Sequence, residues 1–423
     1  MTITTPPPVT PPTVAPADQK PPPPVVPEGP RQIWVQHTSG MVGPHFDNGY
    51  SGAFDASPSG RPDSFLMTGW NQATPDRLSI AYGVLGQPGP IAVSSFPTPG
   101  GYGLDYGSSW QDSASHDLHV VYYTFGGSVQ YWRFRPERSG KGGAIAGVTV
   151  ASQFGLSGAK TIDYPYIQEI VDGDGVRRLV VYGVRGVVAD RADLAVLMTT
   201  PSAGLSPASD ADFAGPNGEA GAVTVATLPT IPYDAVATLA QHRSSRKIEV
   251  LGAVGQHGVT GPHRGVTLTP AGGGWTVGPV RDLPDSTGSD FAVPGRGDEV
   301  WLLWSDASSV HLSTIDSKGA VTLDAVPTPM PAATDYRGAR YLAVAPDGRL
   351  RVIWYLDSAS PPAIRSNVHD GTAWAGWLDV DPAPGPIFEY APLQGLASQG
   401  GRYWGATALS VGGAETSISA ASF

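Results

Sequence analysis

The chain has 423 residues and a formal net charge of −11, with 26 basic and 37 acidic side chains. A nucleic-acid-binding protein would need a basic stripe, and the sequence has none. Cysteine is absent, which excludes disulfides, thiolate metal sites and cysteine nucleophiles. Only 15% of the residues are charged, and the chain contains 54 Gly and 42 Pro. This composition is typical of short strands joined by tight turns, not of helices.

Residues 1–30 are rich in proline and poor in apolar residues. Such a segment is predicted to be an extended tail or linker, because it cannot pack a core. It lacks the basic and apolar regions of a Sec signal peptide. No apolar run reaches the ~18 residues that a membrane-spanning helix needs, so we expect a soluble protein without a membrane span. The tail is either a solvated leader or a tether that attaches the rest of the chain to a larger particle.

From Arg31 onward the pattern becomes strand-like. Short apolar runs rich in β-branched and aromatic residues are bounded by Gly, Asp or Ser, as strands usually are. The clearest of these runs recur in a series that we interpret as the second strand of each repeat: 64–70, 118–123, 179–183, 248–254, 299–304, 350–355 and 403–409. Shorter third strands follow, and fourth strands are expected over 275–280 and 374–380. Residues 201–221 are predicted to form a surface loop.

Each repeat opens on a step that carries a Tyr, an acidic residue or both, and this opening returns about every 50–70 residues. The openings are Asp47 with Tyr50, Tyr102 with Asp105 and Tyr106, Asp163 with Tyr164, Tyr233 with Asp234, Asp290 with Phe291, Asp335 with Tyr336, and Glu389 with Tyr390. A strand-only unit repeated at this period indicates the blades of a β-propeller.

The number of strand sets predicts how the repeat closes. The last set opens near Glu389 and has no fourth strand before the chain ends, whereas residues 32–37 form a lone strand before the first set. We therefore predict an all-β fold over residues 31–423: a seven-bladed β-propeller of four-stranded antiparallel blades, closed by an N-terminal strand that completes the last blade. Six blades would result if the fourth or the seventh set merged with a neighbour.

The openings of the innermost strands should gather at one mouth of the central channel. Tyrosine faces stack on the C–H faces of sugars, and carboxylates accept hydrogen bonds from sugar hydroxyls, so this mixture favours a glycan or another neutral ligand. Clustered carboxylates also suit Ca²⁺. Alternatively, these residues are turn formers and wedges between blades. The candidate ligand-binding residues are Asp47, Tyr50, Tyr102, Asp105, Asp163, Tyr164, Tyr233, Asp234, Asp335, Tyr336, Arg340, Glu389 and Tyr390.

The same residues offer candidates for catalysis. A glycoside hydrolase needs two carboxylates, for which Asp163, Asp234, Asp335 and Glu389 are available. A polysaccharide lyase needs a base, and Tyr164 or Tyr233 is a candidate. The lone histidines, including His242 and His263, are interpreted as structural or surface residues.

One turn carries a family resemblance. The segment from Ser366 to Trp374 resembles a degenerate Asp-box of the sialidase-like (BNR-repeat) propellers, with Gly371 and Trp374 kept and His369 at the usual Asp position. This resemblance implies a propeller, because the Asp-box is a structural turn remote from the active site. Sialidases also need an arginine triad, and Arg340 is the one arginine that we place at the mouth.

The chain is also similar to seven-bladed lectin propellers, whose sugar pockets are lined by Trp and Arg; here the recurring tryptophans also suit packing between blades. They are Trp70, Trp132, Trp275, Trp304, Trp354, Trp374 and Trp377. The leading hypothesis is a carbohydrate-binding, lectin-like or adhesin propeller. The alternatives are a carbohydrate-active enzyme and a structural or receptor-binding component of a phage tail or secretion particle.

Overall fold

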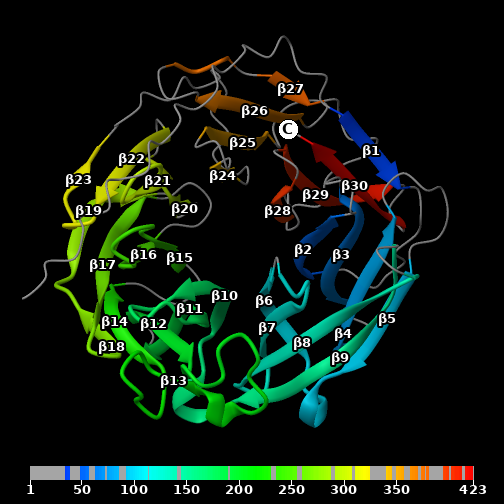
Figure 1. The fold of residues 1–423 in the computed structure, drawn as a ribbon, viewed down its shortest axis with the longest axis horizontal. Coiled ribbons are helices and arrows are strands. Elements are labelled where there is room, and N and C mark those ends of the chain that lie inside the picture. The colour runs from blue at the N-terminus through cyan, green and yellow to red at the C-terminus, as the bar shows by residue number, and fades with distance from the viewer. Residues whose placement is uncertain are drawn as a thin grey trace, which may run out of the picture. The chain divides into compact units, whose positions relative to one another are not determined.

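The computed structural model is built almost entirely of β-strands (Figure 1). It describes residues 34–38, 48–56, 62–71, 74–84, 92–112, 114–140, 144–188, 191–229, 235–254, 260–286, 291–306, 310–323, 340–344, 349–356, 363–369, 373–376, 378–380, 394–399, 402–411 and 415–422. The predicted tail over residues 1–30 lies outside this part of the chain. Of the helices within it, none has the length and apolar character needed to cross a membrane.

The described strands form seven antiparallel sheets, which we number in chain order. The first sheet holds β2 (Asn48–Ala56), β3 (Pro62–Asn71), β4 (Thr74–Val84) and β5 (Ala92–Pro97). The second holds β6 (Leu104–Gln111), β7 (Leu118–Thr124), β8 (Val129–Arg138) and β9 (Ile145–Leu156). The third holds β10 (Tyr164–Val171), β11 (Arg177–Val188), β12 (Arg191–Thr199), β13 (Phe213–Ala214) and β14 (Val223–Leu228).

The fourth sheet holds β15 (Ala235–Gln241), β16 (Ile248–Val254), β17 (Gly261–Ala271), β18 (Gly274–Val277) and β19 (Arg281–Ser286). The fifth holds β20 (Phe291–Pro294), β21 (Glu299–Ser305), β22 (Val310–Asp316) and β23 (Val321–Thr322). The sixth holds β24 (Arg340–Val344), β25 (Leu350–Leu356), β26 (Ala363–His369) and β27 (Leu378–Val380). The seventh holds β28 (Gln394–Gln399), β29 (Arg402–Val411), β30 (Glu415–Ser422) and β1 (Trp34–Thr38).

The all-β prediction is confirmed, and each predicted second strand is the second strand of a sheet. The lone N-terminal strand also pairs as expected: β1 lies antiparallel to β30, with Trp34 opposite Ser422 and Thr38 opposite Ile418. Strands from the two ends of the described chain therefore share one sheet, as Figure 1 shows for β1 and β30.

Three expectations need correction. The third and fourth sheets have five strands instead of four, because β14 and β19 both pair with a strand that already carries a short outer neighbour. The segment 201–221 is more than a surface loop, since Phe213 in β13 is 1% exposed and packs in the core. The last strand of the sixth sheet begins at Leu378, because Trp374 makes only an isolated bridge to His369.

The second strands of the second to fifth sheets are apolar on both faces because each of these sheets packs between two others. In β7, Val120 and Tyr122 belong to a cluster with Leu66 and Trp70 of the first sheet. The intervening Val121 belongs to a different cluster, with residues of the third sheet. Successive strand residues point to opposite faces, so an unbroken apolar run serves two interfaces at once.

The sheets also meet along their first strands. β28 contacts β2, β2 contacts β6, and β6 contacts β10; further along the chain β15 contacts β20, and β20 contacts β24. The residues that open neighbouring first strands are thereby brought near one another.

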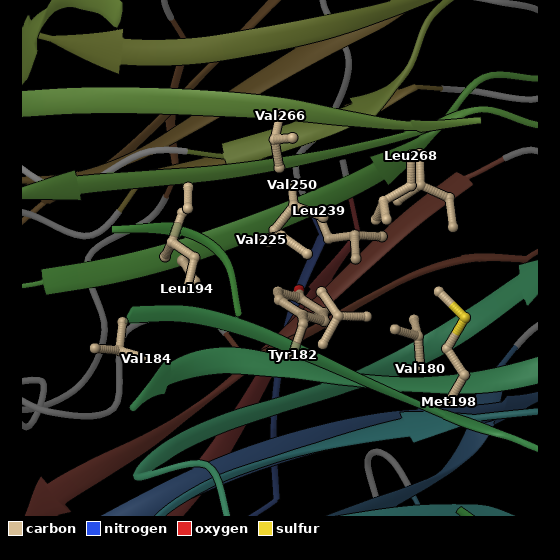
Figure 2. Close-up of a cluster of buried hydrophobic side chains, with 14 of the residues drawn as sticks. Val180, Tyr182, Val184, Leu194, Met198, Val225, Leu239, Val250, Val266 and Leu268 are labelled. Atoms are coloured by element: carbon tan, nitrogen blue, oxygen red, sulfur yellow. The ribbon is translucent and has the colours of Figure 1, made fainter. Parts of the chain in front are cut away.

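A large core cluster joins the third and fourth sheets (Figure 2). Leu194 in β12 is fully buried in this cluster, next to Gly252 of β16. A Cβ atom added at Gly252 would lie 2.5 Å from both methyl carbons of Leu194, closer than such atoms can approach. Glycine is required at position 252 because a side chain of the neighbouring sheet occupies the space that its own would take.

We expect Gly252→Ala to lower the free energy of unfolding by about 1–3 kcal/mol through overpacking. Leu194→Ala alone should cost about 2–5 kcal/mol by leaving a cavity. The double variant should be less destabilised than the sum of the two, as measured by urea unfolding. Gly297→Ala is the matched control, because nothing lies within 4 Å of the added Cβ atom. Additive effects of Gly252→Ala and Leu194→Ala would contradict this account of the interface.

Candidate functional site

The candidate site begins at a β-bulge in the first strand of the second sheet. Leu104 pairs with Thr124 and Gly107 pairs with Tyr122, so Asp105 and Tyr106 together oppose one residue of β7. A bulge adds one unpaired residue and redirects the side chains there, which is why bulges occur often beside binding sites. Gly107 follows the bulge because a Cβ atom at that position would lie 2.2 Å from the carbonyl oxygen of Val121.

The bulge recurs at the same place in two neighbouring first strands. In β2, Gly49 and Tyr50 together oppose one residue of β3. In β28, Gly395 and Leu396 together oppose one residue of β29. Two of the predicted openings, those of Tyr50 and Tyr106, therefore share a backbone distortion that the residue pattern alone did not indicate.

Four tyrosines from the second and third sheets meet at this bulge. The hydroxyl oxygens of Tyr106 and Tyr166 are 2.8 Å apart and share a hydrogen bond. The ring of Tyr106 contacts Tyr164 edge-on at a centroid distance of 5.5 Å. The ring of Tyr166 stacks on Tyr182 at 5.4 Å with an interplanar angle of 19°. We call Tyr106, Tyr164, Tyr166 and Tyr182 the tyrosine cluster.

The backbone of the third sheet holds the cluster in place. Tyr166 and Tyr182 are directly opposite in the pairing of β10 with β11. Gly183 allows the two strands to approach beside Tyr164, since an added Cβ atom would lie 2.0 Å from the Tyr164 carbonyl oxygen. Tyr182 is buried, and burial raises the pKa of its hydroxyl group well above the usual range. Tyr106 is 36% exposed, so the cluster reaches the surface through this residue.

Two half-buried carboxyl groups flank the tyrosine cluster in sequence. Burial raises the pKa of Asp105 above its usual value. Burial also raises the pKa of Asp163, although the Gly186 backbone N–H donates to this carboxylate and the Arg185 guanidinium favours its charged form. Arg185 itself donates to Thr224 Oγ1 at 2.8 Å. Aromatic rings and hydroxyl groups meet in the cluster, and partly desolvated carboxylates adjoin it in the chain; these are groups that can bind a polyhydroxylated ligand.

Trp70 ties the first sheet to this site. Its indole Nε1–H donates to the carbonyl oxygen of Asp105 at 2.7 Å, within the bulge. The side chain is 5% exposed. Because this hydrogen bond uses a backbone oxygen that the bulge leaves unpaired with β7, Trp70 stabilises the distorted conformation of β6.

The remaining predicted site residues divide into three groups. Tyr102 is 49% exposed and its ring lies against Gly100 and Gly126 of nearby turns. Tyr50 and Arg340 lie in β2 and β24, where the structure describes only the backbone. Outside the described residues lie Asp47, Tyr233, Asp234, Asp290, Asp335, Tyr336, Glu389 and Tyr390. Within the part of the chain that is described, no three His, Asp or Glu side chains are grouped to hold a metal ion.

The turn that resembles an Asp-box is structural, and a turn in the fifth sheet is held by hydrogen bonds of the same kind. Asn367 Oδ1 accepts hydrogen bonds from the backbone N–H groups of Val368 and Gly376, and Trp374 packs edge-on against His369. In the fifth sheet, Asp316 Oδ1 accepts from the N–H groups of Lys318 and Ala320. Both turns join the third strand of a sheet to the fourth.

Four of the recurring tryptophans serve packing, not an exposed sugar pocket. Trp70, Trp132, Trp275 and Trp304 are all at most 5% exposed. Trp304 Nε1–H donates to Ser313 Oγ, and its ring stacks on His311 at 4.1 Å. Trp354 and Trp377 lie where the structure describes no side chain.

Two buried histidines also have structural partners. His242 Nδ1 lies 3.1 Å from the backbone oxygen of Asp298, and Nε2 lies 3.2 Å from Glu249 Oε1. His119 Nδ1 lies 2.8 Å from the hydroxyl oxygen of Tyr131. Burial lowers the pKa of His119 to about 4, with Asp117 partly opposing the shift. Neither histidine contacts the tyrosine cluster through a hydrogen bond that the structure records.

Sequence reasoning named Tyr106 and Tyr164 as opening residues but left Tyr182 out of the site. Tyr182 was visible only as the aromatic end of a second strand, and its stacking partner depends on the register of β10 with β11.

No family model matches the sequence, and no curated protein matches it. Several solved structures resemble the chain at low identity. A catalytically inactive virginiamycin B lyase from Staphylococcus aureus, solved with quinupristin, is 11% identical over 93% of this chain and 100% of that chain, with a TM-score of 0.47. Aleuria aurantia lectin, in complex with α-methyl-L-fucoside, is 10% identical over 80% and 96%, with a TM-score of 0.42. A polysaccharide lyase is 10% identical over 90% and 89%, with a TM-score of 0.45. These TM-scores lie below 0.5, and a likeness at this level says nothing about the function of this chain.

The lowered pKa of His119 predicts acid sensitivity. The unfolded chain binds a proton at this position near pH 6.5 and the folded chain near pH 4, so stability should fall as the pH decreases through this window. The contribution is about 3 kcal/mol between pH 7 and pH 4. Thermal unfolding of His119→Gln should show a shallower loss of stability over this range than the unaltered protein. Equal slopes would contradict the assignment.

Proposed function

We propose that this protein binds neutral glycans at the tyrosine cluster. The observation that carries the proposal is the meeting of Tyr106, Tyr164 and Tyr166 from two sheets, with Asp105 and Asp163 beside them in the chain. Tyrosine rings offer flat apolar faces to sugar C–H groups, and their hydroxyls exchange hydrogen bonds with sugar hydroxyls. Carboxylates are strong acceptors for the same hydroxyls. The net charge of −11 disfavours a polyanionic ligand.

We also propose that the seven sheets are the blades of a β-propeller that β1 closes. Three observations support this architecture: the strand order within each sheet, the contacts between successive first strands, and the pairing of β1 with β30. Closure of this kind removes an open edge and fixes neighbouring blades relative to one another. The tyrosine cluster then lies where the first strands of two blades begin, at a mouth of the central channel.

A carbohydrate-active enzyme is the second candidate. The observation that favours it is the raised pKa of Asp163, since partial burial beside a charge partner is typical of carboxylates that transfer protons. Asp163 would act as the acid and Tyr164 as a base or positioning group. Turnover of any glycan that is abolished by Asp163→Asn would favour this reading over binding alone. Attachment to a larger particle through residues 1–30 remains a third hypothesis.

Glycan-array binding tests the first proposal. We expect the protein to retain a set of neutral glycans, and Tyr106→Ala to reduce the signal by about 10-fold through loss of one stacking face and one hydrogen bond. Asp105→Asn should weaken binding less, and mild acidification should weaken the binding of the unaltered protein because the raised pKa of Asp105 allows early protonation. Val150→Ala, an exposed residue of β9, is the control. A blank array with a folded protein would contradict the proposal.

Truncation tests the closure. A chain that begins at residue 31 keeps β1 and should unfold at the same temperature as the full chain. A chain that begins at residue 40 loses β1 and leaves β30 as an edge strand, so its melting temperature should be several degrees lower. Equal melting temperatures of the two truncated chains would argue against a closing role for β1.

A further inference from the structure

A second aromatic surface lies at the same end of the second sheet as the tyrosine cluster. Phe125, in the turn between β7 and β8, is 66% exposed, and Tyr102 just before β6 is 49% exposed. A single exposed apolar side chain is common, but two exposed aromatic rings on neighbouring turns form a patch that can serve a contact. Tyr102 was expected in the site from the sequence, whereas nothing in the residue pattern indicated Phe125.

Both rings are held in fixed positions despite their exposure. The Phe125 backbone N–H donates to the Gly103 carbonyl oxygen at 2.9 Å, and a Cβ atom at Gly103 would lie 2.9 Å from the Phe125 ring. The Tyr102 ring lies on Gly126, where an added Cβ atom would be 2.5 Å away. The Phe125 ring therefore packs on Gly103, the residue after Tyr102, and the Tyr102 ring packs on Gly126, the residue after Phe125. A ligand that stacks on them need not order them first.

Trp70 links this surface to the tyrosine cluster. Its ring meets Phe125 edge-on at 6.4 Å and 87°, and its Nε1–H donates to the backbone of Asp105. Leu104 lies between Tyr102 and the bulge and pairs with Thr124, the residue before Phe125. The two aromatic surfaces are therefore carried by one strand and one turn and share a buried tryptophan.

We propose that Phe125 and Tyr102 form a second sugar subsite, so that the protein takes a neutral oligosaccharide chain and not a single sugar. This inference rests on glycan binding at the tyrosine cluster and extends it along β6. The exposed area of the two rings is roughly 250 Å², which suits a sugar ring or two. A stable protein partner would need about 800 Å² on this side. A polyanionic chain is disfavoured by the half-buried Asp105 next to Tyr106.

The experiment compares chain lengths. The full chain is titrated with mono-, di-, tri- and tetrasaccharides of neutral glucose, mannose, galactose and N-acetylglucosamine series, by calorimetry. We expect the tri- and tetrasaccharide of at least one series to bind about 10-fold more tightly than the corresponding monosaccharide, because a second ring becomes stacked. Phe125→Ala should remove this gain and leave the affinity for the monosaccharide unchanged.

Gly126→Ala provides a second variant, since it displaces the Tyr102 ring without deleting any aromatic group. Like Phe125→Ala, it should reduce the increase in affinity that accompanies a longer saccharide. If Phe125→Ala does not fold, Gly126→Ala still tests the second subsite. Two controls should keep the full gain: Gly297→Ala, where the added Cβ atom meets nothing within 4 Å, and Leu323→Ala, at a residue that directly follows β23 and is 48% exposed.

The outcomes separate the two proposals. Equal affinity for monosaccharide and tetrasaccharide, or an undiminished gain in both variants, overturns the second subsite while glycan binding at the tyrosine cluster stands. If Phe125→Ala lowers the affinity for saccharides of every length by the same factor, the Phe125 ring belongs to the primary site, and the inference is also overturned. No binding of any saccharide by the folded protein overturns both proposals.

Discussion

The structure depends on face-to-face packing between successive sheets, which buries both faces of the second to fifth sheets. Val120 and Val121 are adjacent in β7 but belong to different core clusters, one shared with the first sheet and one with the third. A sheet in this position has no face toward solvent, so its interior strands are largely apolar, and the polar side chains buried in them, such as His119 and Glu249, have hydrogen-bond partners. The same packing requires glycine wherever a neighbouring side chain takes the space of a Cβ atom, as Leu194 does at Gly252. Close packing of side chains between the sheets thus determines both the stability of the fold and the distance between sheets.

The candidate site arises where this regular packing is interrupted. At the bulge in β6, the backbone leaves the ladder for one residue and Tyr106 turns toward the tyrosines of β10. The backbone oxygen of Asp105, which lies in the bulge, accepts a hydrogen bond from Trp70 of the preceding sheet. Three sheets therefore contribute to one local arrangement: Trp70 from the first, Tyr106 from the second and Tyr166 from the third. An irregular backbone of this kind is maintained only when its surroundings hold it from several sides.

Much of the fold could be predicted because strands carry local signals. The seven second strands are runs of β-branched and aromatic residues between turn formers, and these properties depend on nearest neighbours in sequence. The number of strands in the third and fourth sheets was harder to predict from the sequence. Phe213 in β13 is buried through contacts with residues far away in sequence, and the polar residues around it indicated a loop.

The sequence by itself determined the all-β class, the position of each repeat and the recurrence of tyrosine and acidic residues at the repeat openings. These follow from composition and from the two-residue period of a strand, which any local segment displays. Only the tertiary structure decided that Tyr182 stacks on Tyr166, that Asp105 and Tyr106 occupy a bulge, and that Phe125 stays exposed beside Trp70. Each of these depends on strand register and on contacts between sheets, and a shift of one residue in register would send the same side chains to the opposite face.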